Sequence, residues 1–353
     1  MKQSSMMVRL LLFSCLVFPG AAETLRVPRG RAIKHDIRPG PGVTSVRRLS
    51  FYNPGLAKSP GDTMVYILEG KEHGGTAVVV GGTHGSEIAG IMASVILVEH
   101  ARVYQGRLIV IPHANNSAIG YPDPKRPGPA FITLKTAFGP RRFKYGARLT
   151  KLQHQGQGDP PKYRHPASNE SLDGFESRNL DRAYPGKADG TLTERIAFGV
   201  MELIRREGAD IAFDLHESGP EARLAWTVVA HPKNLDTAAM AIINLDAAGI
   251  GMKLEPSSEN FRGLSHREWG DATKAQCFLL ETPNPAMVSA PSSMDTVNDS
   301  KYPLARRIGV QLSTWMAILD VFNEQAGEAL RITLQDVPGL PEIRKSGVES
   351  FFK

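Results

Sequence analysis

The sequence of 353 residues predicts a single α/β domain of three layers (α/β/α), with helices on both faces of a mixed, mainly parallel sheet. Strand-like and helix-like segments alternate along the chain, and no internal repeat interrupts them. A β-branched run ending in glycines precedes a helix-forming stretch and a second apolar run, which is the order of a βαβ unit. The chain is 41% hydrophobic and 22% charged, as expected of a globular domain that needs no disulfide.

The βαβ unit begins at Thr76. Residues 76–82 (TAVVVGG) predict a buried parallel strand, residues 86–104 a helix, and residues 107–112 (RLIVIP) the next strand. The later elements follow the same alternation. They are a helix over 193–206 with Thr193 as its cap, strands over 209–215, 225–231 and 276–280, and helices over 235–248 and 303–325.

The N-terminal residues 1–22 have the pattern of a secretory signal. Lys2 and Arg9 give a positive start, residues 10–18 form a short apolar run, and small residues up to Ala22 suit cleavage. The apolar run is shorter than the about 20 residues that a membrane span needs. We therefore expect an exported protein, periplasmic or secreted, without stable membrane insertion.

Charge and cysteine content narrow the class of protein. Removal of the signal lowers the net charge from +6 to +4, an excess that favours anionic substrates or surfaces. The basic residues are scattered and no recognition motif accompanies them, so we expect no nucleic-acid partner. Cys277 would be the one remaining cysteine, and its apolar surroundings predict an inert core residue.

The catalytic domain is expected to span 23–330, with one irregular segment inside it and a tail after it. Residues 121–175 are rich in Pro, Gly, Lys, Arg and Gln and lack periodicity, which predicts a loop insertion that is either a wall of the site or a solvated loop. The polar residues of interest in it are His154, Tyr163 and His165. Residues 331–353 carry prolines and a glycine and predict a surface tail.

Polar side chains gather where the predicted strands end. His84 and Glu87 follow the first strand, His216 follows the strand over 209–215, and Glu281 follows the strand over 276–280. Ligands of open α/β sheets bind at this edge. Two histidines and one carboxylate, with a fourth position open for water, are the ligand set of a catalytic zinc.

Each residue also has a plainer interpretation. The His-x-x-Glu spacing is short and common, a histidine at a strand end is more often hydrogen-bonded than a ligand, and Glu281 is able to cap a turn. Asp214 lies two residues before His216, on the same face of the predicted strand, and is a candidate to orient its imidazole. Glu217 and Ser218 are expected at the surface. The joint placement, rather than any single residue, favours a metal site.

The ordered motifs resemble a known family. GGTHGSE, IPHANNSAIGY, SRNLDRAYPG, DLHES and LLETP are similar to motifs of the succinylglutamate desuccinylase and aspartoacylase branch of the zinc carboxypeptidase superfamily. The resemblance covers about Val78 to Glu281 and implies a zinc carboxypeptidase-like fold. It also implies one zinc per chain held by His84, Glu87 and His216, although the sequence does not separate zinc from other divalent metals.

The resemblance further implies that Glu281 is the catalytic carboxylate and that Arg182 grips a substrate carboxylate. Arg178 is a candidate for a second guanidinium at the oxyanion. Asp181 departs from the family, which usually has asparagine there. Its charge would weaken binding of an anionic group, receive an ammonium group, or hold Arg182 in place.

These residues predict hydrolysis of the amide bond of a small N-acyl amino acid by metal-activated water. A periplasmic carboxypeptidase or amidase acting on cell-wall or other short peptides is the alternative, and export favours it. A third interpretation is a non-catalytic binding protein on a degenerate hydrolase fold. His266 and Trp269 are weaker candidates for the pocket lining. The sequence indicates neither the substrate nor the oligomeric state.

Overall fold

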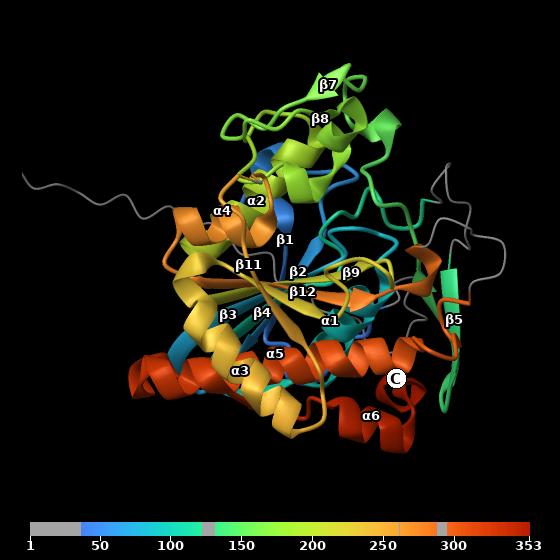
Figure 1. The fold of residues 1–353 in the computed structure, drawn as a ribbon, viewed down its shortest axis with the longest axis vertical. Helices are drawn as coiled ribbons and strands as arrows, with labels where there is room; N and C mark the ends of the chain where they lie inside the picture. The colour runs from blue at the N-terminus through green and yellow to red at the C-terminus, as the bar shows by residue number, and fades with distance from the viewer. Residues whose placement is uncertain (1–36, 122–130, 261, 288–294) are drawn as a thin grey trace, which may run out of the picture.

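The computed structural model describes residues 37–121, 131–260, 262–287 and 295–353 (Figure 1). A nine-stranded sheet forms the middle of the molecule. Its strands are β1 (Ser45–Arg48), β2 (Met64–Glu69), β3 (Glu72–Gly81), β4 (Arg102–Ile111), β9 (Ile211–Ser218), β10 (Thr227–Ala230), β11 (Lys253–Pro256), β12 (Gln276–Pro283) and β13 (Thr333–Gln335).

The sheet is mixed around a parallel centre. Its order is β1-β2-β4-β3-β9-β12-β10-β11, with β13 paired to β4. The four central strands β4, β3, β9 and β12 run parallel, while β2 and β10 join them antiparallel on either side. Parallel neighbours place the carboxyl ends of β3, β9 and β12 at one edge. That edge is where the polar residues of interest lie.

Helices cover both faces of the sheet (Figure 1). They are α1 (Ile88–His100), α2 (Leu192–Arg206), α3 (Leu235–Ala247), α4 (Ser265–Ala272), α5 (Leu304–Ala326) and α6 (Leu340–Ser346). Helices α1, α3, α5 and α6 share one hydrophobic core with one face of the sheet, and α2 packs with α4 in the core on the other. The predicted three-layer α/β architecture is therefore confirmed.

The boundaries of the elements differ from the sequence prediction in small ways. Helix α1 begins at Ile88, and β4 extends back to Arg102. The cap of α2 is Thr191 rather than Thr193, because Thr191 and Glu194 form a capping box. Thr193 is buried and donates its hydroxyl to Gln155 Oε1 at 2.8 Å. The apolar pattern located the helix, whereas the capping contact decided where it starts.

The described part of the segment 121–175, from residue 131 onward, is more ordered than predicted. Strands β5 (Phe131–Thr136) and β6 (Gly139–Lys144) form a hairpin, and β7 (Lys162–Tyr163) pairs with β8 (Leu172–Asp173). The side chains on the inner side of the β5–β6 hairpin are buried; they include Ile132, Leu134 and Phe143. The prediction of an irregular loop is wrong for the hairpin, whose alternating burial is that of a half-buried strand pair.

The C-terminal residues 331–353 are part of the domain, so the predicted surface tail is wrong. Strand β13 pairs with β4, and α6 packs against α5. Leu340, Ile343 and Phe352 are 1–2% exposed. Their apolar side chains join the core beneath α5. Gly339 and Pro341 lie at the start of α6, where proline is compatible with the first turn of a helix.

The predicted signal over 1–22 lies outside the described residues. In the described part, no helix is both long and apolar enough to cross a membrane.

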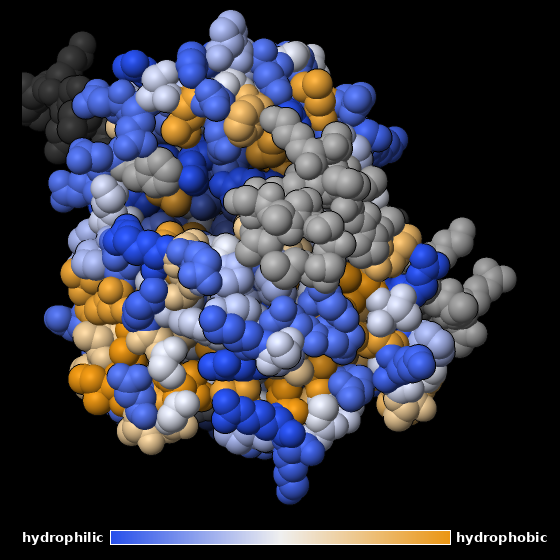
Figure 2. Space-filling model, turned by 45° about the vertical axis from the view of Figure 1, so that its right-hand side comes forward, coloured by the Kyte–Doolittle hydropathy of each residue, from blue (hydrophilic) through white to orange (hydrophobic). Residues whose placement is uncertain are grey.

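Cys277 is buried in β12, and burial raises the pKa of its thiol. On the face shown in Figure 2, hydrophilic side chains cover most of the upper part, where β7 and β8 lie.

Candidate metal and hydrolase site

Four polar residues meet at the carboxyl ends of the central strands. His84 lies in the loop after β3, and Glu87 is the residue directly before α1. His216 and Glu281 lie within β9 and β12, opposite each other in the parallel register. All four are at most 8% exposed and line one pocket. The structure therefore brings together the residues that the sequence placed on this edge.

Glu87 joins the two imidazoles. Its Oε1 is 2.6 Å from His84 Nδ1, and its Oε2 is 3.0 Å from His216 Nδ1. One ligand atom from each of the three residues lies within 4.8 Å of the others. Both histidines thus turn the same ring nitrogen, Nδ1, toward one point, and the carboxylate faces that point as well.

The outward ring nitrogens have oxygen neighbours. His84 Nε2 is 2.8 Å from Asn179 Oδ1, and His216 Nε2 is 2.9 Å from Asp214 Oδ2. The second contact has ion-pair distance but not the alignment of a hydrogen bond. Metal-binding histidines usually present one nitrogen to the metal and the other to a carboxylate or carbonyl oxygen. The arrangement therefore fits a metal ion bound through both Nδ1 atoms.

A second group of possible ligands shares His216. It comprises Asp181, Asp214 and His216, whose ligand atoms also lie within 4.8 Å of one another. Both oxygens of Asp214 accept from the Thr83 hydroxyl, at 2.9 and 3.1 Å. Asp214 is thus held as an outer partner of His216. In the group with His84 and Glu87, both Nδ1 atoms face the one carboxylate, so this group is the better candidate for the metal.

The charges of the buried groups support one another. Burial disfavours the ionised form of Glu87, but His84 and His216 hold the pKa of this carboxyl well below its usual range. Burial also opposes the charge on His216, yet Asp214 and Glu87 raise its pKa. Burial raises the pKa of Glu281 to about 8, with Glu87 and Asp181 adding to the shift and His216 opposing it. Glu281 is therefore suited to hold and release a proton.

Two glycines let the backbone form the site. Gly82 has a φ of +69°, where a side chain would be strained and its Cβ would lie 2.8 Å from the Pro112 carbonyl oxygen. Gly90, in the first turn of α1, would bring a Cβ to 2.3 Å from the Leu215 carbonyl oxygen. The chain therefore bends before His84, and α1 sits directly against β9.

A buried ion pair lies beneath the metal group, and it corrects a prediction. Glu217, expected at the surface, is 2% exposed. One of its oxygens contacts Arg307 of α5, and the other accepts from the Ala89 backbone at 3.0 Å. Its own backbone N–H donates to Glu87 Oε2 at 3.0 Å. Glu217 thus ties β9 to the start of α1 and to α5. Ser218 is half-buried and lines the pocket, so its predicted surface position was also wrong.

The pocket in front of the metal group has a volume of about 300 Å³. Asp181 and Arg182, the residues predicted to bind substrate, are among its lining residues. Arg178 is not among its described lining residues. The Arg178 guanidinium instead pairs with Asp159 at 2.7 Å and donates to the Thr150 carbonyl at 2.9 Å. The geometry gives no support to its predicted role at the oxyanion.

Arg148 is the residue that the sequence analysis missed. It lines the pocket, and it makes no ion pair or side-chain hydrogen bond with any residue that the structure describes. Glu281 and Arg182 line the same pocket, so the three side chains share one cavity. A partly buried arginine without a partner suits an anionic group of a ligand. The irregular composition of 121–175 concealed it, because no periodic pattern singled out one of the many basic residues there.

The remaining candidates divide between pocket and scaffold. His266 lines the pocket, whereas Trp269 is fully buried against Tyr184 in the core. The three candidates of segment 121–175 make hydrogen bonds within the protein. Tyr163 donates to the Arg182 carbonyl at 2.7 Å, and His165 Nε2 lies 2.7 Å from the Tyr184 carbonyl. His154 Nδ1 lies 2.9 Å from the Ser117 hydroxyl. The segment therefore forms part of the pocket wall through Arg148.

No family model matches the chain, and no curated protein matches it. The solved structures that are similar to it include succinylglutamate desuccinylases and a metallo-carboxypeptidase. A succinylglutamate desuccinylase from a Silicibacter species is 20% identical, with 79% of this chain and 64% of that chain covered and a TM-score of 0.45. A metallo-carboxypeptidase from Burkholderia cenocepacia is 12% identical, with 81% and 66% covered and a TM-score of 0.49.

A succinylglutamate desuccinylase/aspartoacylase from Rhodobacter sphaeroides is 17% identical, with 75% of this chain and 59% of that chain covered and a TM-score of 0.44. This chain thus spans less than two thirds of the length of each of the three structures.

Proposed function

We propose that this protein is a zinc-dependent hydrolase that cleaves the amide bond of a small N-acyl amino acid. The observation that carries the proposal is the joint geometry of four buried residues. His84, Glu87 and His216 converge on one point, and Glu281 lines the same pocket without belonging to the ligand set. A binding protein needs no proton acceptor beside a metal group, so this combination favours catalysis.

Zinc, when bound by His84, Glu87 and His216, supplies Lewis acidity toward water and the amide carbonyl. The protein supplies the proton transfer. Glu281 Oε2 is buried and makes no hydrogen bond within the described part of the chain, so the ionised form of Glu281 has a position open to take a proton from the attacking water. Glu281 then passes this proton to the nitrogen of the leaving amine, which completes hydrolysis of the amide.

The arginines define the chemistry of the substrate. Arg148 and Arg182 line the same pocket, and their guanidinium groups suit a carboxylate or the developing oxyanion of the amide. A pocket of about 300 Å³ lies at the lower end of the range for small-molecule sites. Together these features favour a small anionic substrate, such as an acylated amino acid, over a folded protein.

A peptidase or amidase acting on short peptides outside the inner membrane is the second candidate. The feature that favours it is the signal-like sequence of residues 1–22, because catabolism of acyl-amino acids inside the cell needs no export. We propose a periplasmic or secreted location on the same basis. Cell fractionation of the full chain tests it: the proposal requires a shortened form in the periplasm or medium, and full-length protein in the cytoplasm would contradict it.

Hydrolysis assays with the zinc-loaded protein test the function. A panel of N-acyl amino acids beside short peptides is incubated with the native protein and with Glu281→Gln, and release of free amine is measured. We expect acyl-amino acids to be cleaved by the native protein and not by the variant. Cleavage of peptides alone would select the second candidate. Zinc binding without cleavage of either class would indicate the binding protein.

A further inference from the structure

Asp181 is a buried carboxylate at the wall of the pocket. It is 4% exposed, and its Oδ1 accepts the Ser265 backbone N–H at 2.8 Å, at the start of α4. Its Oδ2 is 3.5 Å from Arg182 Nη1. A carboxylate has about four acceptor positions, so these contacts leave part of its capacity unused. A donor group of a ligand is able to bind at the remaining acceptor positions of this carboxylate.

The neighbouring side chain adds no positive charge to this wall. His266 follows Ser265, lines the pocket, and has its Nε2 2.9 Å from the Ser257 hydroxyl. Burial lowers the pKa of His266 to about 4, so the imidazole is neutral near pH 7. Its Nδ1 has no hydrogen-bond partner among the residues described. The wall formed by Asp181 and His266 therefore offers a carboxylate and no cation.

Receptors for opposite charges lie side by side in the pocket. Arg148 and Arg182 suit a carboxylate, and Asp181, adjacent to Arg182 in the chain, suits a cation. A carboxylate oxygen of Asp181 lies within 4.8 Å of a ring nitrogen of His216. A cationic group bound to Asp181 would therefore lie a few atoms from the amide that is cleaved.

We propose that the substrate is a mono-acylated diamino acid of short chain, whose carboxylate binds Arg148 and Arg182 and whose free ammonium binds Asp181. This inference rests on the proposed hydrolase function and names the substrate class within it. The amide between the acyl group and the other amino group is then the bond that is hydrolysed. The products are a carboxylic acid and a free diamino acid.

A structural role for Asp181 predicts a different result. If Asp181 only fixes the start of α4 and orients Arg182, its replacement by asparagine changes all substrates alike. If Asp181 binds an ammonium group, the replacement changes only those substrates that carry one. Asparagine keeps the Oδ1 acceptor for the Ser265 N–H, so Asp181→Asn removes the charge with little change of shape.

The test compares two acetylated ornithines with an acetylated amino acid that has no ammonium group; Nα-acetylornithine and Nα-acetylnorvaline differ only in that group. The zinc-loaded native protein, Asp181→Asn and the matched control Asp159→Asn are assayed with Nα-acetylornithine, Nδ-acetylornithine and Nα-acetylnorvaline, which lacks the second amine. Asp159 pairs with Arg178 outside the pocket lining. Thermal unfolding and zinc content of each variant confirm its fold, and kcat/KM is measured for each pair.

We expect the native protein and Asp159→Asn to prefer one acetylornithine over acetylnorvaline by about 10- to 100-fold, as for a charged hydrogen bond. In Asp181→Asn this preference falls close to one, with little change for acetylnorvaline. If the native protein has equal kcat/KM values for acetylornithine and acetylnorvaline, the inference is overturned. A preference for acetylornithine that survives in Asp181→Asn would also overturn it. Either result leaves the hydrolase function standing. About two zinc ions per native chain, with one lost in Asp181→Asn, would overturn it by making Asp181 a metal ligand.

The comparison of acetylornithine with acetylnorvaline tests the inference even if Asp181→Asn does not fold, because the native protein alone must prefer the substrate with the ammonium group. Hydrolysis of none of these substrates, nor of any other acyl-amino acid or peptide, by zinc-loaded protein would be a failure of the proposed function itself. That result differs from hydrolysis without preference, which contradicts only the substrate class.

Discussion

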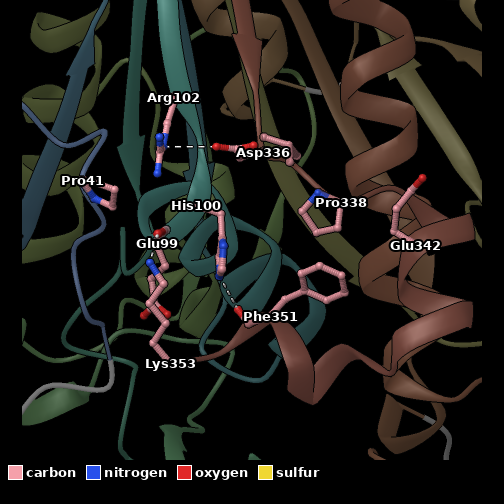
Figure 3. Close-up of a pocket in the computed structure, with 10 residues that line it drawn as sticks. Pro41, Glu99, His100, Arg102, Asp336, Pro338, Glu342, Phe351 and Lys353 are labelled. Carbon is pink, nitrogen blue, oxygen red and sulfur yellow. Dashed lines mark hydrogen bonds and ion pairs between the residues drawn. The ribbon is translucent and has the colours of Figure 1, made fainter. Parts of the chain in front are cut away.

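Two cavities of similar size in this protein use their polar groups in opposite ways. The site pocket, in front of His84, Glu87 and His216, has a volume of about 300 Å³. The second cavity, of about 360 Å³, lies where α1 meets the C-terminal segment (Figure 3). We name it the C-terminal cavity; its charged or titratable lining residues are Glu99, His100, Arg102, Asp336, Glu342 and Lys353.

In the C-terminal cavity, each of these groups has a partner within the protein. Arg102 pairs with Asp336 at 3.2 Å, and His100 Nε2 lies 2.9 Å from the Phe351 carbonyl oxygen (Figure 3). Glu99 contacts Arg141, Glu342 accepts from the Gly339 N–H at 2.9 Å, and Lys353 donates to the Glu99 carbonyl at 3.3 Å. These contacts fasten the end of the chain to the domain.

The site pocket, by contrast, keeps polar groups without partners. Within the described residues, Glu281 Oε2 and His266 Nδ1 are buried and unbonded, and Arg148 lines the pocket without forming an ion pair. Unpaired buried polar groups cost stability, so a protein retains them where a ligand completes them. The comparison teaches that unused hydrogen-bonding capacity, rather than cavity volume, distinguishes the functional pocket.

The largest effect is expected at the proton acceptor. Glu281→Gln removes the group that takes the proton of water but keeps the shape of the side chain and leaves the three ligands in place. We expect kcat to fall by about 10²- to 10⁴-fold, with zinc content unchanged. Kinetics combined with metal analysis measures both quantities. A variant with near-native kcat would show that the proton is taken elsewhere.

The two arginines that compete for one role give the next effect. Arg148→Ala removes the unpaired guanidinium and is expected to lower kcat/KM by about 10²- to 10³-fold, as for loss of an oxyanion donor. Arg178→Ala removes a guanidinium already paired with Asp159 and is expected to change kcat/KM much less. The reverse order in steady-state assays would favour the prediction made from sequence over the geometry.

Zinc affinity is expected to respond to an outer partner of the site. Asp214→Asn removes the carboxylate beside His216 Nε2, which orients that ligand. We expect zinc affinity to fall by about 10- to 100-fold, as for other outer-shell substitutions. Titration against a competing chelator measures the change, and Asp159→Asn serves as the matched control. An unchanged affinity would mean that Asp214 has no part in orienting His216.

The smallest effect is expected in the C-terminal cavity. Arg102 and Asp336 are 54% and 47% exposed, so solvent screens the pair. Arg102→Ala should leave kcat/KM unchanged within about 2-fold and alter the free energy of unfolding by about 0–1 kcal/mol. Steady-state kinetics and denaturant unfolding provide the measurements. A large loss of activity would contradict the view that this cavity is structural.

The sequence predicted the features that follow from hydrophobic periodicity and strand ends. It located the central strands, most of the helices, and the edge where His84, Glu87, His216 and Glu281 meet, because the carboxyl ends of parallel strands share one edge. It failed where long-range contacts decide. Glu217 is polar and next to a ligand, and only the packing of α5 brings Arg307 to it and buries it.

The arginines show the same limit. Arg178 lies near Asp181 and Arg182 in the sequence, which made it a natural candidate, but Asp159 draws its guanidinium away. Arg148 lies more than 30 residues earlier, in a segment without periodicity, and reaches the pocket only through the folded path of that segment. Strand-end rules do not apply to such loops.

The central claim is that His84, Glu87 and His216 hold one catalytic zinc. Its most direct test is the metal content of purified native protein and of His84→Ala, each offered zinc and then freed of excess, with hydrolysis assayed on the same samples. The account predicts about one zinc per native chain, and loss of both zinc and activity in His84→Ala. A native protein that binds no zinc, or a His84→Ala variant that keeps both zinc and activity, would contradict it.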